Sequence, residues 1–435
     1  MDAVNITQLC HQADGVAEGL VYAPLTLPGE VVTGHLEGQQ LRGMRVIVPS
    51  LERVAALCTL FKVCGGGQLQ HASELFDAIF KTNIVLTALA GQGLETASRS
   101  IKTSPPHSRR RAVFSARRTK KSALAEVFSQ ASDVIVALSD CQLLNLDLVQ
   151  ALPMVEALAS IGVSRRAVLN VTVICAEAGL DVSVVGGNPL DQALRGFLAA
   201  QAEAFCLARL SWDDEIVAMR HPPPQKFGLV RVAAPPGASL QATEHGEQKL
   251  LAAVQDAVSE ARSVVYLFCG SGAFTLSLAQ KAELHAVDSV SNVASFLDHG
   301  WRQAKDLKKV THAVRDLFRR PLLADQLRKF KAVVLNPPPA GAAAQVEVIA
   351  NIAVPRIAYD PCNPVSFARE SAVLTEAGFN LDWVQVVDQF CWSAHVELAA
   401  QVTASSCSTL TVKESCPTWA FFCYEQKIFE LYQCR

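Results

Sequence analysis

An apolar run, a glycine turn and a helix-like segment follow one another at residues 263–280, and this succession restricts the fold more than any other feature. The run SVVYLF is typical of a buried strand, and it breaks at a CGSG turn that contains Gly270 and Gly272. Glycines at such a turn let the backbone approach a bound nucleotide closely. Asp288 lies 18 residues after Gly270, at the end of a second apolar run, where a carboxylate would face ribose hydroxyls. The pattern predicts an α/β domain that binds a nucleotide-containing ligand.

Two further apolar runs, at residues 331–335 and 355–359, lead into residues that can carry chemistry. The first ends at Asn336 and the second leads to Cys362, and open α/β sheets bind ligands at the carboxyl ends of such strands. Glu397 follows Cys362 by 35 positions, so a candidate base accompanies a candidate nucleophile. Taken alone, each residue also fits a purely structural role, since a free cysteine is a common core residue and a lone glutamate usually lies on a solvated face.

Six stretches in this order resemble the S-adenosylmethionine-dependent RNA (uracil-5-)-methyltransferase family. They are PPGASLQAT, LFCGSGAFTLSLA, RDLFRRPL, NPPPAGA, CNPVSFARE and DQFCWSAHVEL. The chain up to residue 403 resembles the branch of the family that carries a TRAM domain and acts on 23S ribosomal RNA. The resemblance implies a Rossmann-like class I methyltransferase domain, S-adenosylmethionine as the methyl donor and RNA as the substrate.

The resemblance also implies a role for each matched residue. Cys362 would be the nucleophile that adds to C6 of uracil, so that C5 can take up a methyl group. Glu397 would be the base that then removes the C5 proton. The expected contacts to S-adenosylmethionine, from the family and from the strand ends, are Gln241, Phe268, Gly270, Gly272, Asp288, Asp316 and Asn336.

The chain departs from the family pattern near the expected donor site. Asn336 and Tyr266 stand where the family usually has aspartates, and Pro339 stands where it has an arginine. Asn336 can accept a hydrogen bond but brings no charge, and Pro339 supplies no guanidinium. A non-catalytic RNA-binding descendant of the family therefore stays open as an alternative.

Residues 4–43 alternate short apolar runs with Gly and Pro, which predicts a small barrel of short strands joined by tight turns. Any small β-domain would fit this pattern taken alone. The order DGVA and then LPGE resembles the TRAM domain of the family, an OB-like barrel that binds RNA. We therefore expect a TRAM-like, RNA-binding barrel at residues 1–50.

A group of cysteines follows the expected barrel. Cys58 and Cys64 precede the stretch GGGQLQH, and their C-x5-C spacing is not a standard zinc spacing. In the resembling branch four cysteines hold a [4Fe-4S] cluster, and the third and fourth of them match Gly67 and Cys141. The resemblance thus offers Cys58, Cys64 and Cys141 as ligands of an iron-sulfur cluster that lacks one family thiolate.

Residues 96–124 carry nine Lys and Arg residues and no Asp or Glu, although the formal net charge of the whole chain is −2. The stretch RAVFSAR has an apolar centre framed by basic residues, as a half-buried strand would. A solvated basic loop is the alternative, but a basic stripe suits the phosphate backbone of RNA. The candidate RNA-binding residues are Arg109, Arg110, Arg111, Arg117 and Arg118.

The chain has 435 residues, more than one hydrophobic core normally serves. We expect a central, mostly-β domain at 51–235, a methyltransferase domain at 236–403 and an unassigned tail at 404–435. The helical stretch 73–94 is expected to pack on the methyltransferase domain. No membrane span is expected, because charges, Pro or Asn interrupt every long apolar stretch. The 13 cysteines and the absence of a signal-peptide pattern favour a reducing cytoplasm, and we expect a monomer.

The predicted function is the formation of 5-methyluridine, in 23S ribosomal RNA in particular. The 23S target rests on the barrel together with the cysteines, since tRNA-directed relatives usually lack the cluster. A tRNA uridine-5 methyltransferase and an RNA cytosine-5 methyltransferase stay open besides the RNA-binding descendant. The cytosine enzymes share the thiolate addition, but they usually place a carboxylate to protonate N3, and the sequence shows no such residue.

Overall fold

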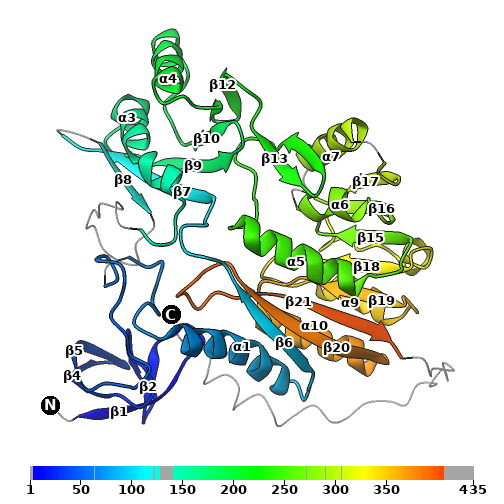
Figure 1. Ribbon diagram of the computed structural model, residues 1–435, viewed down its shortest axis with the longest axis horizontal. Coiled ribbons are helices and arrows are strands. Elements are labelled where there is room, and N and C mark those ends of the chain that lie inside the picture. Colours follow the sequence, from blue (N-terminus) through cyan, green and yellow to red (C-terminus); the bar gives the residue numbers. More distant parts are fainter. Residues whose placement is uncertain are drawn as a thin grey trace.

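The chain folds into a closed barrel, a six-stranded sheet, an eight-stranded sheet and a two-stranded sheet. The computed structural model describes residues 3–62, 64–120, 123–127, 141–270, 272–289, 291–304 and 306–405. Figure 1 shows the barrel at the lower left, the six-stranded sheet at the upper left and the eight-stranded sheet on the right. The expected tail at 404–435 lies outside the described residues from 406 onward.

The N-terminal barrel confirms the expected small β-domain, and its strands pair in the order β1-β2-β3-β5-β4. Ile6, Val32 and Leu41 fill its small core. Gly15 permits a close approach, because a Cβ there would lie 2.1 Å from Oγ1 of Thr26. The strands are β1 (Val4–Leu9), β2 (Gly15–Ala17), β3 (Val21–Ala23), β4 (Val31–Glu37) and β5 (Gln40–Val48).

The eight-stranded sheet has the order β17-β16-β15-β18-β19-β21-β20-β6. Its first five strands run parallel, and β21 is antiparallel to both β19 and β20. The apolar runs read from the sequence form the central strands, as expected for strands buried on both faces. The strands are β15 (Ser263–Leu267), β16 (Glu283–Asp288), β17 (Val310–Val314), β18 (Ala332–Leu335), β19 (Arg356–Tyr359), β20 (Phe379–Asp388) and β21 (Glu397–Ala404).

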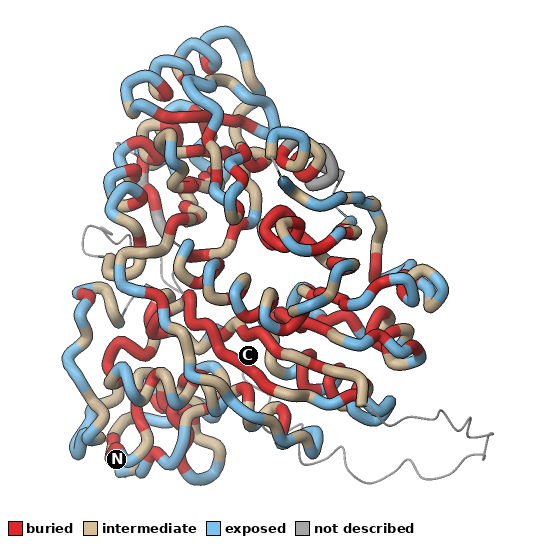
Figure 2. Tube along the Cα trace, turned by 45° about the vertical axis from the view of Figure 1, so that its right-hand side comes forward, coloured by how far each residue is buried: buried red, intermediate tan, exposed pale blue. Residues whose placement is uncertain are grey.

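Helices cover both faces of this sheet, each over its own hydrophobic core. On one face lie α5 (Glu244–Ala257), α6 (Ala273–Leu278) and α7 (Ser291–Gln303). On the other face lie α1 (Glu74–Ala90), α8 (Ala324–Leu327), α9 (Ala343–Ala350) and α10 (Pro364–Glu376). Figure 2 shows the consequence, since the middle of the sheet is buried while the barrel surface and the outer helices are exposed.

Two elements of the large sheet come from the range expected for the central domain. The helix α1 packs on α10 and on the sheet through Val85 and Leu89. The strand β6 (Ala97–Thr103) pairs in parallel with β20 and forms one edge of the sheet. The sheet thus extends beyond the expected range 236–403. The sequence did not indicate β6 because it is an edge strand with mostly exposed, polar residues.

A buried charge cluster fixes α1 to the sheet. Lys81 is fully buried, and its Nζ lies 2.6 Å from Oδ2 of Asp388 and 3.3 Å from Oδ2 of Asp77. Removing one partner of such a cluster leaves a buried charge without compensation, which typically costs about 3–5 kcal/mol. This cluster explains why a helix from the first quarter of the chain stays on the distant sheet.

The six-stranded sheet has the order β12-β11-β10-β9-β7-β8. Within this sheet β9 and β10 pair as an antiparallel hairpin, and the helix α4 follows them in the chain. In β7 the residues Ala112, Phe114 and Ala116 point into the core. The elements are β7 (Arg111–Arg118), β8 (Ala123–Val127), α2 (Leu146–Gln150), α3 (Leu152–Gly162), β9 (Leu169–Ala176), β10 (Gly179–Val185), α4 (Gln192–Ala204), β11 (Arg209–Trp212) and β12 (Glu215–Met219).

A short two-stranded sheet, β13 (Pro224–Phe227) and β14 (Val230–Ala233), connects the six-stranded sheet to the eight-stranded one. Phe227 and Val232 belong to the core beneath α6 and α7, so this hairpin is anchored on the larger sheet. Within the described part of the chain, no helix is both long and apolar enough to cross a membrane.

Candidate active site

A cavity of about 540 Å³ opens at the carboxyl ends of the parallel strands. Residues that are far apart in the sequence meet there because β15, β16, β18 and β19 all end at this edge of the sheet. Most of the predicted catalytic and donor-binding residues line it. Its lining includes Arg109, Arg111, Gln241, Tyr266, Phe268, Gly270, Phe274, Asp288, Phe318, Asn336, Cys362, Phe390 and Glu397.

The glycine turn after β15 forms one wall of the cavity. Gly270 adopts a left-handed φ of 53°, and no atom lies within 4 Å of a Cβ placed on it, so the backbone is open to a ligand. Gly272 has φ 73° and lets α6 approach α7, since a Cβ there would lie 2.4 Å from Leu297. The carboxylate of Asp288 accepts a hydrogen bond from the N–H of Gly270 at 2.9 Å. Turn and carboxylate together form the cradle that a nucleoside-containing donor such as S-adenosylmethionine fits.

Two aromatic rings form another wall. Phe268 and Phe318 lie with ring centroids 5.4 Å apart and both line the cavity. Asp316, which was expected at the donor, is not among the lining residues. Its Oδ1 instead accepts hydrogen bonds from the N–H groups of Phe318 and Arg319 at 3.0 and 3.2 Å. Asp316 therefore holds the loop that presents Phe318.

Cys362 lies in the loop between β19 and α10, half-buried at the floor of the cavity. The neighbouring Asn363 caps α10 by accepting from the N–H of Val365, and its Nδ2 donates to the carbonyl of Pro339 at 2.8 Å. Burial, followed by the negative charges of Glu397 and Asp360, raises the pKa of the Cys362 thiol to about 11. The side chain is thus a thiol at neutral pH in the protein alone, and it needs a base or a cation to react.

Glu397 begins β21 and faces the same cavity. Its Oε2 accepts a hydrogen bond from Nε2 of Gln389 at 3.3 Å, and its Oε1 lies 3.8 Å from Nε2 of His395. The same Nε2 of Gln389 donates to Oε1 of Gln241 at 2.7 Å. Gln389 is buried and connects a predicted donor contact with the predicted base, although the sequence analysis assigned it no role. The one sequence signal was its place inside the DQFCWSAHVEL stretch.

The departures from the family pattern also meet in the cavity. Nδ2 of Asn336 donates to the hydroxyl of Tyr266 at 3.3 Å. Tyr266 is fully buried apart from its access to the cavity, and burial raises the pKa of its hydroxyl well above the usual value. Asn336 and Tyr266 are thus two neutral groups at positions where the resemblance leads us to expect aspartates.

Two of the predicted RNA-binding arginines line the cavity. Arg109 and Arg111 are half-buried, and burial lowers the pKa of both guanidinium groups. Nε of Arg111 is buried without a hydrogen-bond partner among the described residues. Guanidinium groups that are desolvated without an anionic partner favour the entry of an anion such as a phosphate.

The remaining three arginines differ in their surroundings. Arg117 and Arg118 are exposed at the end of β7, where a phosphate backbone could reach them. Arg110 is buried and pairs with Glu247 of α5, and its Nε donates to the carbonyl of Gln241 at 3.3 Å. It connects the six-stranded sheet with the eight-stranded one. That Arg110 binds RNA stays a prediction, and its ion pair with Glu247 places its side chain in a buried contact with α5.

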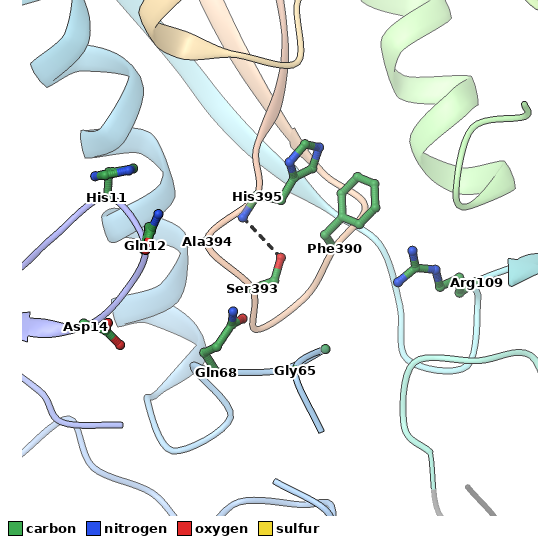
Figure 3. Close-up of a pocket in the computed structure, with 11 residues that line it drawn as sticks. His11, Gln12, Asp14, Gly65, Gln68, Arg109, Phe390, Ser393, Ala394 and His395 are labelled. Atoms are coloured by element: carbon green, nitrogen blue, oxygen red, sulfur yellow. Dashed lines mark hydrogen bonds between the residues drawn. The ribbon is translucent and has the colours of Figure 1, made fainter. Parts of the chain in front are cut away.

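A second cavity of about 590 Å³ adjoins the first. In Figure 3 the ring of Phe390 lies between His395 and Arg109, while His11, Gln12 and Asp14 of the barrel face them from the left. Arg109 and Phe390 line both cavities, and the guanidinium carbon of Arg109 lies 5.2 Å from the ring centroid of Phe390. Arg109 and Phe390 thus form a wall common to the two cavities, which together are called the depression between the barrel and the large sheet.

The expected iron-sulfur ligands do not form a ligand set. Cys58 is buried, Cys64 and Cys141 are half-buried, and no three Cys, His, Asp or Glu side chains among the described residues have the geometry of a metal site. A Cβ at Gly67 would lie 2.6 Å from Nε2 of Gln70. Oε1 of Gln70 accepts a hydrogen bond from the N–H of Cys58 at 3.1 Å. The residues present do not fit a cluster held by four thiolates, and no chemical step is assigned to one.

Comparison with known proteins identifies the family, although no family model matches the chain. An uncharacterized RNA methyltransferase from Mesorhizobium japonicum is 39% identical over 399 residues, which cover 91% of this chain and 96% of that protein. The chain belongs to the RNA methyltransferase family. A second member, from Rhizobium meliloti, is 38% identical over 91% of this chain and 98% of its own length.

Uracil-C5 enzymes belong to the same family. The 23S rRNA (uracil(1939)-C(5))-methyltransferase of Pectobacterium atrosepticum is 29% identical over 92% of this chain and 93% of that protein. The tRNA (uracil-54, C5)-methyltransferase of Pyrococcus abyssi, solved with S-adenosyl-L-homocysteine, superposes with a TM-score of 0.72 at 18% identity. The match covers 92% of this chain and 99% of that protein, so the two share a fold. The resemblance to the RNA (uracil-5-)-methyltransferase family and the predicted α/β methyltransferase fold with an OB-like barrel are confirmed.

Proposed function

We propose that this RNA methyltransferase forms 5-methyluridine, with Cys362 as the nucleophile and Glu397 as the base. The observation that carries the proposal is that both residues line the cavity that also contains the glycine turn and Asp288. A methyl donor on the turn would therefore have its reactive end in the same space as the thiol and the carboxylate. S-adenosylmethionine, when bound, supplies the methyl group.

The chain's own residues provide the remaining chemistry. Cys362 passes its proton to solvent and its thiolate adds to C6 of the target uracil, which forms an enolate whose C5 is nucleophilic. After C5 has taken up the methyl group, Glu397 removes the C5 proton and the thiolate leaves. Gln389 holds the Glu397 carboxylate in place by the hydrogen bond from its amide. Gln241 shares that amide, so its side chain couples the donor wall to the base.

The donor site fits Gln241, Phe268, Gly270, Asp288 and Asn336 as contacts, whereas Gly272 lets α6 approach α7 and Asp316 acts through the loop of Phe318. The adenine ring suits the aromatic wall of Phe268 and Phe318, and the ribose suits Asp288. Asn336 can offer its amide to the donor without adding charge.

RNA would enter along the depression between the barrel and the large sheet. Arg109 and Arg111 lie where the phosphates beside the target nucleotide would pass, and Arg117 and Arg118 extend the basic surface. Phe390, which lines both cavities, offers a ring on which a neighbouring base can stack. A uracil must leave its stack to reach the thiol, and an aromatic platform lowers the cost of that step.

We propose 23S ribosomal RNA as the target and a monomer in the cytoplasm as the acting form. The support for the target is the similarity to the Pectobacterium atrosepticum enzyme, whose name specifies 23S rRNA, over nearly the whole of both chains. The barrel at the mouth of the depression supports an RNA substrate of some length. The proposed mechanism uses no iron-sulfur cluster, because Cys58, Cys64 and Cys141 form no metal-ligand group among the described residues.

The proposal is tested by mass spectrometry of nucleosides from cells with and without this protein, with ribosomal and transfer RNA separated before digestion. We expect 5-methyluridine to fall in 23S rRNA and to return with the intact gene but not with a Cys362→Ala copy. A loss confined to transfer RNA would correct the target. Unchanged 5-methyluridine in every fraction would refute the function.

A further inference from the structure

A buried carboxyl that the proposed reaction does not use neighbours residues of the catalytic cavity, although it is not itself among the lining residues. Asp360 follows β19 and is 3% exposed. Its N–H donates to the carbonyl of Leu335 at 2.8 Å, which places it beside Asn336 of the neighbouring strand. Neither carboxyl oxygen of Asp360 has a hydrogen-bond partner among the described residues. An ionised carboxylate in such a place is far more costly than a neutral acid.

The groups around Asp360 make ionisation still less favourable. The titratable groups that interact with it are Tyr266 of β15, Glu397 of β21 and Cys362 of its own loop, and none of them is a cation. Burial, and then the charge of Glu397, raises the pKa of Asp360 well above its usual value. In the protein without ligand, Asp360 is therefore a neutral acid at neutral pH.

Asp360 also lies next to two neutral residues of the cavity wall. Tyr266 and Asn336 hydrogen-bond to each other and bring no charge to the cavity floor. The other carboxylates nearby already accept hydrogen bonds, Asp288 from Gly270 and Glu397 from Gln389. Of these three carboxyls, Asp360 is the one whose two oxygens have no such partner among the described residues. A cation entering the cavity above would supply the missing counter-charge.

We propose that Asp360 is the counter-charge for the cationic methyl donor, an inference that rests on the donor site of the proposed function. The side chain carries its proton in the ligand-free protein and releases it to solvent when a sulfonium occupies the cavity. Cation binding and proton release then favour each other by the same coupling free energy. S-adenosylhomocysteine lacks the sulfonium charge and leaves the proton on Asp360. Asp360 thereby sets the preference of the cavity for charged donor over neutral product.

The test is titration calorimetry of the full-length protein in buffers of different ionisation enthalpy, with S-adenosylmethionine and S-adenosylhomocysteine as the probes. We expect S-adenosylmethionine to release a proton and S-adenosylhomocysteine to release none. Asp360→Asn should abolish the release. Asp382→Asn is the matched control and should retain it, because Asp382 also has an oxygen without a hydrogen-bond partner but bonds to Thr403, which pairs with Arg356 at the opposite end of β19.

The Asp360→Asn variant should also bind the two probes with an altered ratio of affinities. Asp360→Asn is expected to weaken S-adenosylmethionine binding about 5- to 150-fold, the usual range of coupling between two sites, while S-adenosylhomocysteine binding stays nearly constant. In the wild type, affinity for S-adenosylmethionine should rise with pH until Asp360 ionises in the free protein. The Asp360→Asn variant should lack this rise. Cys362→Ala should keep the proton release, which excludes the thiol as its source.

Infrared spectroscopy tests the proposal without any variant. A protonated carboxyl gives a carbonyl stretching band that carboxylates lack, and this band should vanish on addition of S-adenosylmethionine and persist with S-adenosylhomocysteine. Equal proton release with both probes, or release retained in Asp360→Asn, overturns the proposal. Since none of these readouts requires methyl transfer, an enzyme that fails to methylate RNA but releases the proton refutes the proposed function and leaves this inference standing.

Discussion

The catalytic cavity and the cysteine segment at residues 58–71 both depart from the family pattern, but only the cavity keeps its parts together. Cys362, Glu397 and the glycine turn line one space even though Asn336 and Tyr266 stand where the resemblance leads us to expect aspartates. In the cysteine segment, Gln70 fills the space that a side chain at Gly67 would need. The cavity lacks the expected charges but keeps its residues together. The cysteine segment lacks one expected ligand, and its cysteines form no ligand set among the described residues.

The difference follows from what holds each region in place. The cavity lies at the ends of strands whose two faces are covered by helices, so backbone pairing positions its residues whatever their charge. The described residues between β5 and α1 include no helix or strand, and the cysteine segment lies among them. A metal site without such a scaffold depends on its ligands for geometry, because binding and folding are coupled. When one ligand is absent, metal binding contributes less free energy to bringing the remaining ligands together.

The largest effect is expected at Cys362. Cys362→Ala removes the nucleophile and should lower methyl transfer by several orders of magnitude, because C5 of uracil is not activated without addition at C6. RNA binding should remain, since the arginines of the depression supply it. Transfer of labelled methyl groups to RNA and filter binding measure the two quantities separately. Cys206→Ala, which alters an exposed thiol on the central domain, is the matched control. A normal rate in Cys362→Ala would disprove the covalent route.

The next largest effect is expected at Glu397. Glu397→Gln keeps the shape of the side chain but removes the base, so addition and methylation should proceed and release should stall. Turnover should fall about 10²- to 10⁴-fold, the usual contribution of a positioned base. A protein-RNA adduct that survives a denaturing gel is the expected sign. Glu376→Gln changes an exposed carboxylate at the end of α10 and should form no such adduct. Full turnover without an adduct would place the base elsewhere.

Much of the fold was predictable because parallel strands buried on both faces appear as continuous apolar runs. The sites at the strand ends were predictable for the same reason, since Asn336 and Cys362 directly follow such runs. The edge strand β6 was not, because its exposed polar residues carry no such pattern. The contacts of Arg110 with Gln241 and of Gln389 with Gln241 join segments that are far apart in the chain, and periodicity along the sequence does not record such contacts.

A smaller effect is expected from restoring a charge at the donor site. Asn336→Asp places a carboxylate on the cavity wall, where a cationic donor can make a charge-assisted hydrogen bond of about 1.5 to 3 kcal/mol gross. We expect the Kd for S-adenosylmethionine to fall roughly tenfold, as measured by calorimetry. Asn351→Asp adds the same charge at an exposed position at the end of α9 and should change nothing. An unchanged Kd in Asn336→Asp would mean that this position does not contact the donor.

The smallest effect is expected at Gly67. A fourth cysteine there would complete the family's ligand set, yet its side chain would meet Nε2 of Gln70, which lies 2.6 Å from a Cβ at that position. Gln70 would have to give up its hydrogen bond with the N–H of Cys58, at a cost of about 0.5 to 1.5 kcal/mol.

We therefore expect anaerobically purified wild type and Gly67→Cys to be colourless and free of stoichiometric iron, with the variant slightly less stable in thermal unfolding. Gly67→Ser makes the same steric demand without a thiolate, so any difference between Ser and Cys reports metal binding alone. Brown protein with the broad absorption of an iron-sulfur cluster would reverse the comparison. That result would mean that the three thiolates of Cys58, Cys64 and Cys141 do bind one cluster. The cysteine segment would then have kept its metal site, just as the cavity keeps its catalytic residues together.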